Sequence, residues 1–263
     1  MVLKETITYY VHQNNNVLCT FLDASKAFDR VNYCKLFRIL VERGLPPCII
    51  RVLINMYVTQ QACVSWAGII SDYFSVHNGV RQGGVLSPIL FCVYIDNLLQ
   101  RLSRSGVGCY LGTNFAGTLA YADDIVLVCP TPSAMRKLLL ICDAFATEYD
   151  IKFNAQKSKL LVVSSHNCRR QANSQTTHCS FSIGGNPIER VESFSHLGHI
   201  ITSSLSDEDV RFRRNCFISQ VNNMICFFSK FSCSTRTKLF QAYCNSRYGC
   251  ELWSLYRGVG SKL

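Results

Sequence analysis

The sequence of 263 residues lacks any apolar stretch near the roughly 20 residues that a membrane-spanning helix requires, so we expect no membrane partner. We expect no secretory leader, because Met1–Glu5 leads directly into a helix-like pattern. Its 15 cysteines include no Cys-x-x-Cys pair, which argues against a zinc ribbon or a thioredoxin-like motif. Charged residues are few, 17% against 48% hydrophobic, and this excludes a disordered chain. We therefore expect a folded protein with reduced cysteines in the nucleus or cytoplasm.

Acidic residues are also scarce, with 17 Asp and Glu against 27 Lys and Arg, a formal charge of +10. Residues 1–163 carry 15 basic and 11 acidic groups, a net of +4. Residues 164–263 carry 12 and 6, a net of +6, so the positive charge is denser in the C-terminal part. Such an excess favours a polyanionic partner such as nucleic acid, although it also serves solubility, and charge alone does not separate the two.

Two aspartates, Asp123 and Asp124, interrupt a run of strand-forming residues from Leu119 to Val128. Neighbouring side chains on a strand point to opposite faces, but a tight hairpin turn allows both carboxylates to face one point. Two like charges in an apolar setting favour a bound cation, and hard divalent ions such as Mg²⁺ prefer oxygen ligands. The alternative is a surface turn with two solvated acids, and the segment Tyr121–Asp124 by itself does not favour either the metal site or the solvated turn.

A third acid, Asp23, ends a stretch from Leu18 that has the pattern of a buried strand, and Phe28 follows five residues later. Nucleotidyl transfer uses two metal ions about 3.5–4 Å apart, one activating the attacking hydroxyl and one holding the phosphates. Three carboxylates, one from a strand end and two from a hairpin, are able to supply the ligands for such a pair.

Six segments, in this order along the chain, together resemble the reverse transcriptases of non-LTR (LINE-like) retrotransposons and, more distantly, those of group II introns. They are Asp23–Asp29 (Asp-x-x-x-Ala-Phe-Asp), Arg81–Pro88, Tyr121–Asp124, Ile151–Lys159, Phe194–Ile201 and Tyr248–Trp253. The resemblance extends from about residue 5 to about residue 255.

The resemblance implies an α+β fold: a polymerase palm, in which a ferredoxin-like antiparallel sheet packs on helices, with partial fingers and a helical thumb-like C-terminal region. It predicts two domains, a palm with partial fingers at residues 1–163 and a primer-grip turn with the thumb-like region at residues 164–263. Only 22 residues precede Asp23, so we expect most of the N-terminal fingers of this family to be missing.

The resemblance also implies roles for single residues. Asp23 and Asp123 become the main metal ligands with Asp124 beside them, all three catalytic and holding two Mg²⁺ ions, with Mn²⁺ as an alternative. Phe28 takes the place of the sugar gate, whose ring collides with a ribose 2′-hydroxyl, although a core phenylalanine is the alternative. Lys157 matches a lysine that assists the pyrophosphate leaving group, although a solvated surface charge is the alternative. Substrate contacts are expected from Phe28, Arg81, Gln82, Gly83 and Tyr121.

The implied function is that of an RNA-directed DNA polymerase, a reverse transcriptase domain that uses an RNA template, a DNA primer and deoxynucleoside triphosphates. Further domains of a longer element polyprotein would accompany it. The alternative is a truncated, inactive retroelement remnant that only binds nucleic acid. A viral RNA-dependent RNA polymerase is a weaker third reading, because Phe28 stands where a small polar residue would accept a ribose.

Local patterns predict where the helices and one hairpin lie. We expect Asn32 to cap a helix that Gly44 ends, and Ser87 followed by Pro88 to cap and begin another. Residues 61–67 and 70–76 have the pattern of paired strands. Further helices are expected from Pro47, Pro132 and Ser206, and the last has an apolar stripe expected to lie in the core: Val210, Phe217, Val221, Met224, Ile225 and Phe228.

Overall fold

The computed structural model describes residues 2–164, 179–206 and 208–244. These residues fall into two compact units, one from Thr6 to Val191 and the other from Glu192 onward together with the residues up to Glu5. Of the six segments that carry the resemblance, Tyr248–Trp253 lies outside the described residues.

The larger unit is built on one five-stranded sheet with the strand order β13-β10-β1-β9-β8. All neighbouring strands are antiparallel except β10 and β13, which run parallel. The strands are β1 (Val17–Asp23), β8 (Thr118–Tyr121), β9 (Asp124–Cys129), β10 (Lys159–Val163) and β13 (Glu189–Val191). The sheet therefore continues past residue 163, while the functional division at that residue stays a prediction.

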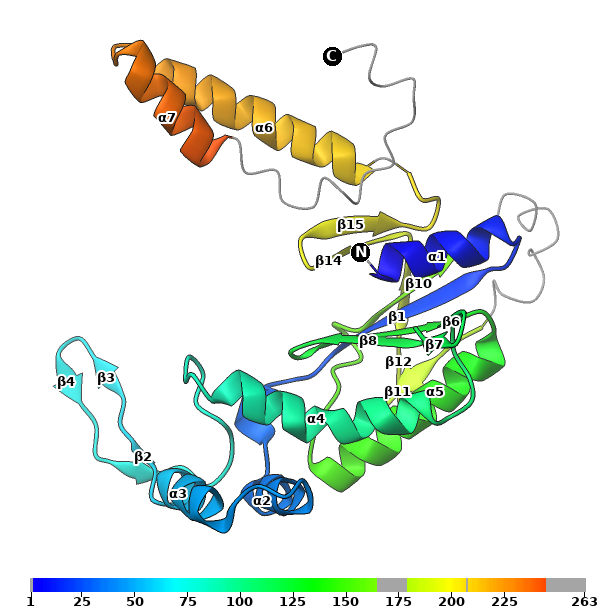
Figure 1. The fold of residues 1–263 in the computed structure, drawn as a ribbon, viewed down its shortest axis with the longest axis vertical. Helices are drawn as coiled ribbons and strands as arrows, with labels where there is room; N and C mark the ends of the chain where they lie inside the picture. Colours follow the sequence, from blue (N-terminus) through cyan, green and yellow to red (C-terminus); the bar gives the residue numbers. More distant parts are fainter. Residues whose placement is uncertain (1, 165–178, 207, 245–263) are drawn as a thin grey trace. The chain divides into compact units, whose positions relative to one another are not determined.

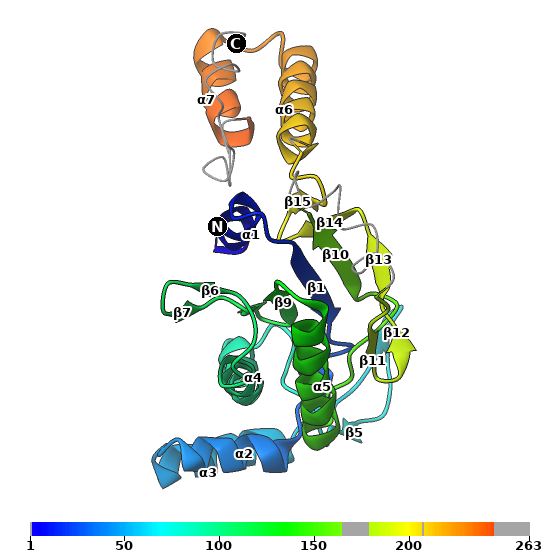
Figure 2. The same cartoon turned by 90° about the vertical axis from the view of Figure 1, so that its right-hand side faces the viewer.

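The central strand β1 is buried on both faces, as its unbroken apolar run requires. Leu18 and Leu22 point into a core cluster formed with Leu127 of β9 and helices α4 (Ser87–Ser103) and α5 (Pro132–Tyr149). Thr20 lies on the same face, where its hydroxyl contacts the Met135 sulfur of α5 at 3.1 Å. Figure 2 shows α4 and α5 on this side of the sheet. Because side chains alternate, Asp23 points to the opposite face.

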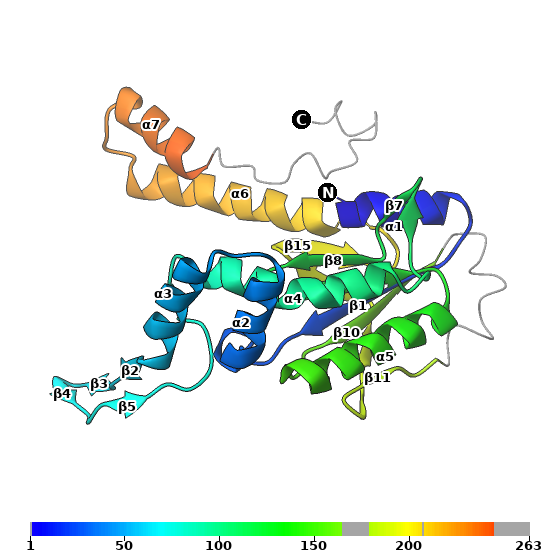
Figure 3. The same cartoon turned by 60° about the horizontal axis from the view of Figure 1, so that its bottom comes forward.

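Helices α2 (Tyr33–Glu42) and α3 (Pro47–Val58) follow β1, and two short two-stranded ladders extend beyond them, as Figures 1 and 3 show. The ladders pair β2 (Gln61–Ala62) with β5 (Phe74–Ser75) and β3 (Ser65–Trp66) with β4 (Ile69–Ile70), so the predicted hairpin is confirmed in interrupted form. Asn32 caps α2 by accepting from the Lys35 backbone N–H at 3.2 Å, and Gly44 follows the helix at φ +76°, as predicted.

The expected cap of α4 is wrong by one residue. Leu86 occupies the N-cap position and makes no side-chain capping bond, and Ser87 is the first helical residue and is buried. Pro88 still lies in the first turn, where its missing N–H has no helical partner to lose. For α5 the cap is Thr131, whose hydroxyl accepts from the Ala134 backbone N–H at 3.3 Å before Pro132 begins the helix.

Minor elements complete the larger unit: α1 (Val2–His12), which begins in the smaller unit, and the pairs β6 (Tyr110–Leu111) with β7 (Asn114–Phe115) and β11 (Ser182–Ile183) with β12 (Asn186–Pro187). Among the described residues, no helix combines the length and the apolar character needed to cross a bilayer.

The smaller unit contains a hairpin of β14 (Ser193–His196) and β15 (His199–Thr202), followed by α6 (Glu208–Phe227) and α7 (Cys233–Tyr243). The expectation that the α6 stripe forms a core is wrong. In the described part of α6 only Asp209 is buried, and Ile225 of the stripe is 51% exposed. Within the described residues α6 packs on β15 and on α7, as in the edge-to-face contact of Phe217 with Phe240 at 6.2 Å between ring centroids.

Candidate catalytic site

The turn between β8 and β9 presents the two neighbouring aspartates. Tyr121 pairs with Asp124, which leaves Ala122 and Asp123 as a two-residue turn. Ala122 has a φ of +53°, whereas Asp123 is not among the residues with positive φ, and this is the pattern of a type II′ hairpin turn. The predicted tight hairpin is confirmed. It removes Asp123 from the strand alternation, so this carboxylate need not point away from Asp124.

The third aspartate lies directly across from this hairpin. Asp23 is the last residue of β1 and is the cross-strand partner of Asp124, the first residue of β9. Directly opposed residues on antiparallel strands project to the same face with Cβ atoms about 4.5–5.5 Å apart, and like charges there repel each other. A hard divalent cation relieves that repulsion, and an all-carboxylate set is the donor chemistry that Mg²⁺ prefers.

The backbone therefore brings the three aspartates to one end of the sheet, and their donor set fits a magnesium site. The side chains do not close around a common point. Within the described residues, no group of three or more His, Cys, Asp or Glu side chains is arranged to hold a metal ion. Asp23 is half-buried and Asp124 is exposed.

The loop that carries Lys157 is bound to the backbone of Asp23. The Asp23 carbonyl accepts from the Asn154 N–H at 2.8 Å, and the Asp23 N–H donates to the Ser158 hydroxyl at 3.1 Å. Asn154 also shapes the loop, since its side-chain oxygen accepts from the Gln156 and Lys157 N–H groups at 3.0 and 3.3 Å. Lys157 is exposed in this loop, at the same end of β1 as Asp23.

Ser158 is a site-building residue that sequence reasoning missed. It is fully buried, and its hydroxyl is the acceptor that fixes the Asp23 backbone. A serine between two lysines reads as a solvated surface residue, so the local sequence carried no signal for this contact.

Phe28 begins a short 3₁₀ helix, Phe28–Arg30, five residues after Asp23. Its ring stacks on Phe91 of α4 with 4.9 Å between centroids and 29° between planes, and it packs against the core cluster without being fully buried. The gate and core readings of Phe28 are thus compatible, because one face of the ring rests on α4 while part of the side chain stays accessible.

The loop with Arg81, Gln82 and Gly83 is attached to the segment that carries Phe28. The Val80 N–H donates to the Phe28 carbonyl at 2.8 Å, and the Gly79 N–H donates to the Val31 carbonyl at 2.9 Å. The Gln82 side-chain amide donates to a carboxylate oxygen of Asp29 at 3.2 Å. Asp29 therefore links the segment that carries Phe28 to the loop that is expected to contact substrate.

Tyr33 binds the loop that carries Arg81, Gln82 and Gly83 from the side of the core. Its buried hydroxyl donates to the Gly79 carbonyl at 2.9 Å. Burial raises the pKa of this phenol, the nearby Tyr57 raises it further, and the charge of Arg81 lowers it in part, so the group stays a neutral donor. A pocket of about 480 Å³ lies beside the loop, lined mainly by polar side chains that include Asp29, Gln60, Asn78, Arg81 and Gln82.

Tyr121 is 69% exposed at the end of β8, where its ring is accessible next to the aspartate turn.

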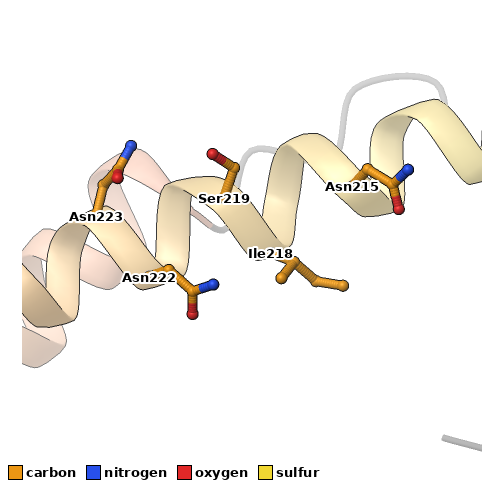
Figure 4. A pocket seen from close by; sticks show the side chains of 5 residues that line it. All are labelled: Asn215, Ile218, Ser219, Asn222 and Asn223. Atoms are coloured by element: carbon orange, nitrogen blue, oxygen red, sulfur yellow. The ribbon is translucent and has the colours of Figure 1, made fainter.

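The described residues of α6 carry another accessible surface. Figure 4 shows Asn215, Ser219, Asn222 and Asn223 with Ile218 on this helix, around a shallow pocket of about 430 Å³.

Residues 3–201 match the family described as reverse transcriptase (RNA-dependent DNA polymerase). The Retrovirus-related Pol polyprotein from type-2 retrotransposable element R2DM of Drosophila melanogaster is 30% identical over 186 residues, which are 70% of this chain and 17% of that protein. The probable RNA-directed DNA polymerase from transposon X-element of the same species is 25% identical over 268 residues, 97% of this chain and 27% of that protein. The chain thus spans less than a third of the length of these relatives.

Solved structures resemble the fold. The apo telomerase from Candida tropicalis, truncated from its C-terminal domain, aligns with a TM-score of 0.53 and 13% identity over 78% of this chain and 38% of that one. Telomerase of the same organism in complex with a fragment of telomeric RNA aligns with a TM-score of 0.52 and 12% identity, covering 91% of this chain and 40% of that chain. These likenesses confirm the predicted α+β polymerase fold.

Proposed function

This chain belongs to the reverse transcriptase family, and we propose that it catalyses RNA-templated DNA synthesis as the polymerase domain of a LINE-like retroelement. One observation carries the proposal: Asp23 and Asp124 are direct cross-strand partners, and Asp123 lies in the turn next to them. The end of β1 and a hairpin 100 residues later in the sequence are thereby paired, which brings the three aspartates to one end of the sheet.

Divalent metal ions are general to this family, and Asp23, Asp123 and Asp124 are the residues that would hold two Mg²⁺ ions here. When bound, such ions activate an attacking hydroxyl and neutralise charge on the phosphates. The chain's own contribution is positioning. The Asn154 and Ser158 hydrogen bonds hold the Asp23 backbone, and the type II′ turn holds Asp123 beside Asp124.

The substrate-facing residues surround these acids. Phe28, resting on Phe91, would meet the sugar of an incoming nucleotide and exclude a 2′-hydroxyl. Arg81, Gln82 and Gly83 would lie under the nucleotide and template, because their loop is hydrogen-bonded to the Phe28 segment. Lys157 would approach the leaving pyrophosphate, and Tyr121 would contact substrate beside the turn.

The partners that we propose are an RNA template, a DNA primer and deoxynucleoside triphosphates, with further domains of a longer polyprotein. The net charge of +10 supports a polyanionic partner, since phosphate contacts provide affinity without sequence choice. We propose a nuclear or cytoplasmic location, which the free thiols of the described cysteines support.

Primer extension on an RNA template with Mg²⁺ tests the proposal. Asp123→Ala should lower incorporation by about a thousandfold, because several kcal/mol of charge stabilisation are lost. Asp72→Ala, which removes an exposed acid between β4 and β5, is the matched control and should retain activity. Preferential incorporation of ribonucleotides would instead favour an RNA polymerase.

A second function is favoured by the open arrangement of the aspartate side chains. A remnant that binds nucleic acid without polymerising would give equal background in the wild type and in Asp123→Ala. Retained duplex binding in both proteins would then support this second function over the first.

A further inference from the structure

The turn between β14 and β15 has an unfavourable backbone conformation. His196 pairs with His199, so Leu197 and Gly198 form a two-residue turn, with φ angles of +48° and +78°. Positive φ at two successive residues is the pattern of a type I′ turn, which Gly and Asn tolerate and a bulky residue such as Leu does not. The Leu197 side chain is 51% exposed, so its own packing does not explain this conformation. Such strain persists where surrounding contacts hold it.

Asp209, in the first turn of α6, supplies the first of these contacts. It is the buried residue of that helix, with 9% of its surface exposed. One carboxylate oxygen accepts from the Ile200 backbone N–H at 3.1 Å, and the other lies 3.1 Å from Nδ1 of His199. The carboxylate therefore binds the strand that leaves the turn through a backbone group as well as a side chain.

Arg213, one helical turn later, supplies the second contact. Its Nε lies 3.3 Å from both oxygens of Asp209, and its Nη2 donates to the Gly198 carbonyl at 2.6 Å. Burial alone would raise the pKa of Asp209, but the hydrogen bonds from His199 and Ile200 and the charge of Arg213 outweigh it and lower that pKa. The carboxylate is thus ionised at neutral pH, and hydrogen bonds to a charged group are stronger than neutral ones.

We infer that Asp209 and Arg213 are positioning residues that hold the Leu197–Gly198 turn in the conformation that receives the primer strand. The inference rests on the proposed function, because Phe194–Ile201 resembles the primer-grip turn of the polymerases that carry out that function. Asp209 binds the backbone N–H of Ile200 and Arg213 binds the backbone carbonyl of Gly198, so the pair contacts the backbone on both sides of His199. The first two turns of α6 are therefore hydrogen-bonded directly to Gly198 and Ile200.

Two measurements on the full chain test the inference. Fluorescence anisotropy with a labelled DNA-primer/RNA-template duplex gives affinity, and amide hydrogen exchange of residues 197–202 gives the rigidity of the turn. Asp209→Asn should weaken duplex binding by about tenfold, the factor expected for one lost charge-assisted hydrogen bond, and should speed exchange of the Ile200 amide. Glu208→Gln removes the same charge one residue away and should change neither quantity. Asp209→Glu, which keeps the carboxylate, should restore part of both.

If Asp209→Asn fails to fold, Arg213→Lys tests the same contact while keeping the charge of the helix. Arg214→Lys is its matched control. Where extension is measurable, both Asp209→Asn and Arg213→Lys should raise the KM for primer more than they lower kcat. Unchanged exchange, equal affinities in the test and control variants, or a wild type that binds no duplex would each overturn the inference. A wild type that binds the duplex but never extends it contradicts the polymerase proposal only, and the affinities of the variants still decide the role of Asp209 and Arg213.

Discussion

Replacing Gly79 by alanine should destabilise the loop that carries Arg81, Gln82 and Gly83 more than the loss of backbone freedom alone explains. Gly79 has a φ of +92°, and a Cβ atom there would lie 2.8 Å from both the Cα and the carbonyl oxygen of Asp29. These are backbone atoms, so no side-chain rotation relieves the overlap. The loop must move away from residues 28–31, which carry the sugar-gate candidate.

The expected loss follows from the contacts that this movement breaks. An alanine at positive φ costs about 1–2 kcal/mol by itself. The hydrogen bonds from Gly79 N–H to Val31, from Val80 N–H to Phe28 and from the Tyr33 hydroxyl to Gly79 contribute roughly 1 kcal/mol each. The loss of most of these hydrogen bonds, added to the strain, should lower the free energy of unfolding by about 3–5 kcal/mol, which is a large part of the stability of an ordinary domain.

Urea unfolding of the full chain, followed by far-UV circular dichroism, measures this loss. Gly68→Ala is the matched control, because Gly68 has a φ of +82° and no atom within 4 Å of its added Cβ. It should lose only the 1–2 kcal/mol of strain. If the two variants unfold at the same urea concentration with equal slopes, the contact between Gly79 and Asp29 has no energetic consequence and the reasoning is refuted.

Three further predictions concern the gate, the core and the effect of pH. Phe28→Val should raise ribonucleotide incorporation by an active polymerase severalfold, measured against deoxynucleotides in competition, and unchanged sugar discrimination would remove Phe28 from the gate. Tyr94→Phe should lower the free energy of unfolding by about 1–3 kcal/mol, because the buried Tyr94 hydroxyl donates to the Tyr149 carbonyl at 2.6 Å. Burial raises the pKa of this hydroxyl to about 12, so it remains a donor. An unchanged urea midpoint would contradict this prediction. The pKa of Asp209 is lowered in the folded chain, so its ionised carboxylate stabilises the fold above the ordinary pKa of about 3.9, and this stabilisation is lost as pH falls below that value. In thermal unfolding from pH 6 to pH 2.5, Asp209→Asn should therefore reduce the fall of the melting temperature at acid pH. Identical pH profiles of the wild type and the variant would count against the ionised contact.

Much of the site was predictable because its signals are local. Adjacent aspartates in a strand-forming run require a turn, and the structure has one at Ala122–Asp123. Asn32, Gly44 and Pro132 marked helix boundaries because capping and φ preferences act within a few residues. The capping residue of α4 was misplaced by one position, since Ser87 has the composition of a cap but is buried as the first helical residue.

The α6 stripe was misread for a different reason. Periodicity shows which side of a helix is apolar, but it does not show whether a partner surface exists to cover it. In the described residues α6 packs on α7 and on the β14–β15 hairpin, and this is not enough to bury Ile225. Tertiary context, and not the repeat, decides whether a stripe becomes a core.

The sequence alone predicted the family, the strand that ends at Asp23 and the hairpin that carries Asp123, because each depends on short motifs and on neighbours in sequence. The tertiary structure alone decided that Asp23 faces Asp124, that Ser158 fixes the Asp23 backbone, and that Asp209 and Arg213 grip the Leu197–Gly198 turn. These contacts depend on strand pairing and on helix placement. Both are set by how buried surfaces fit together in three dimensions, which no local pattern encodes.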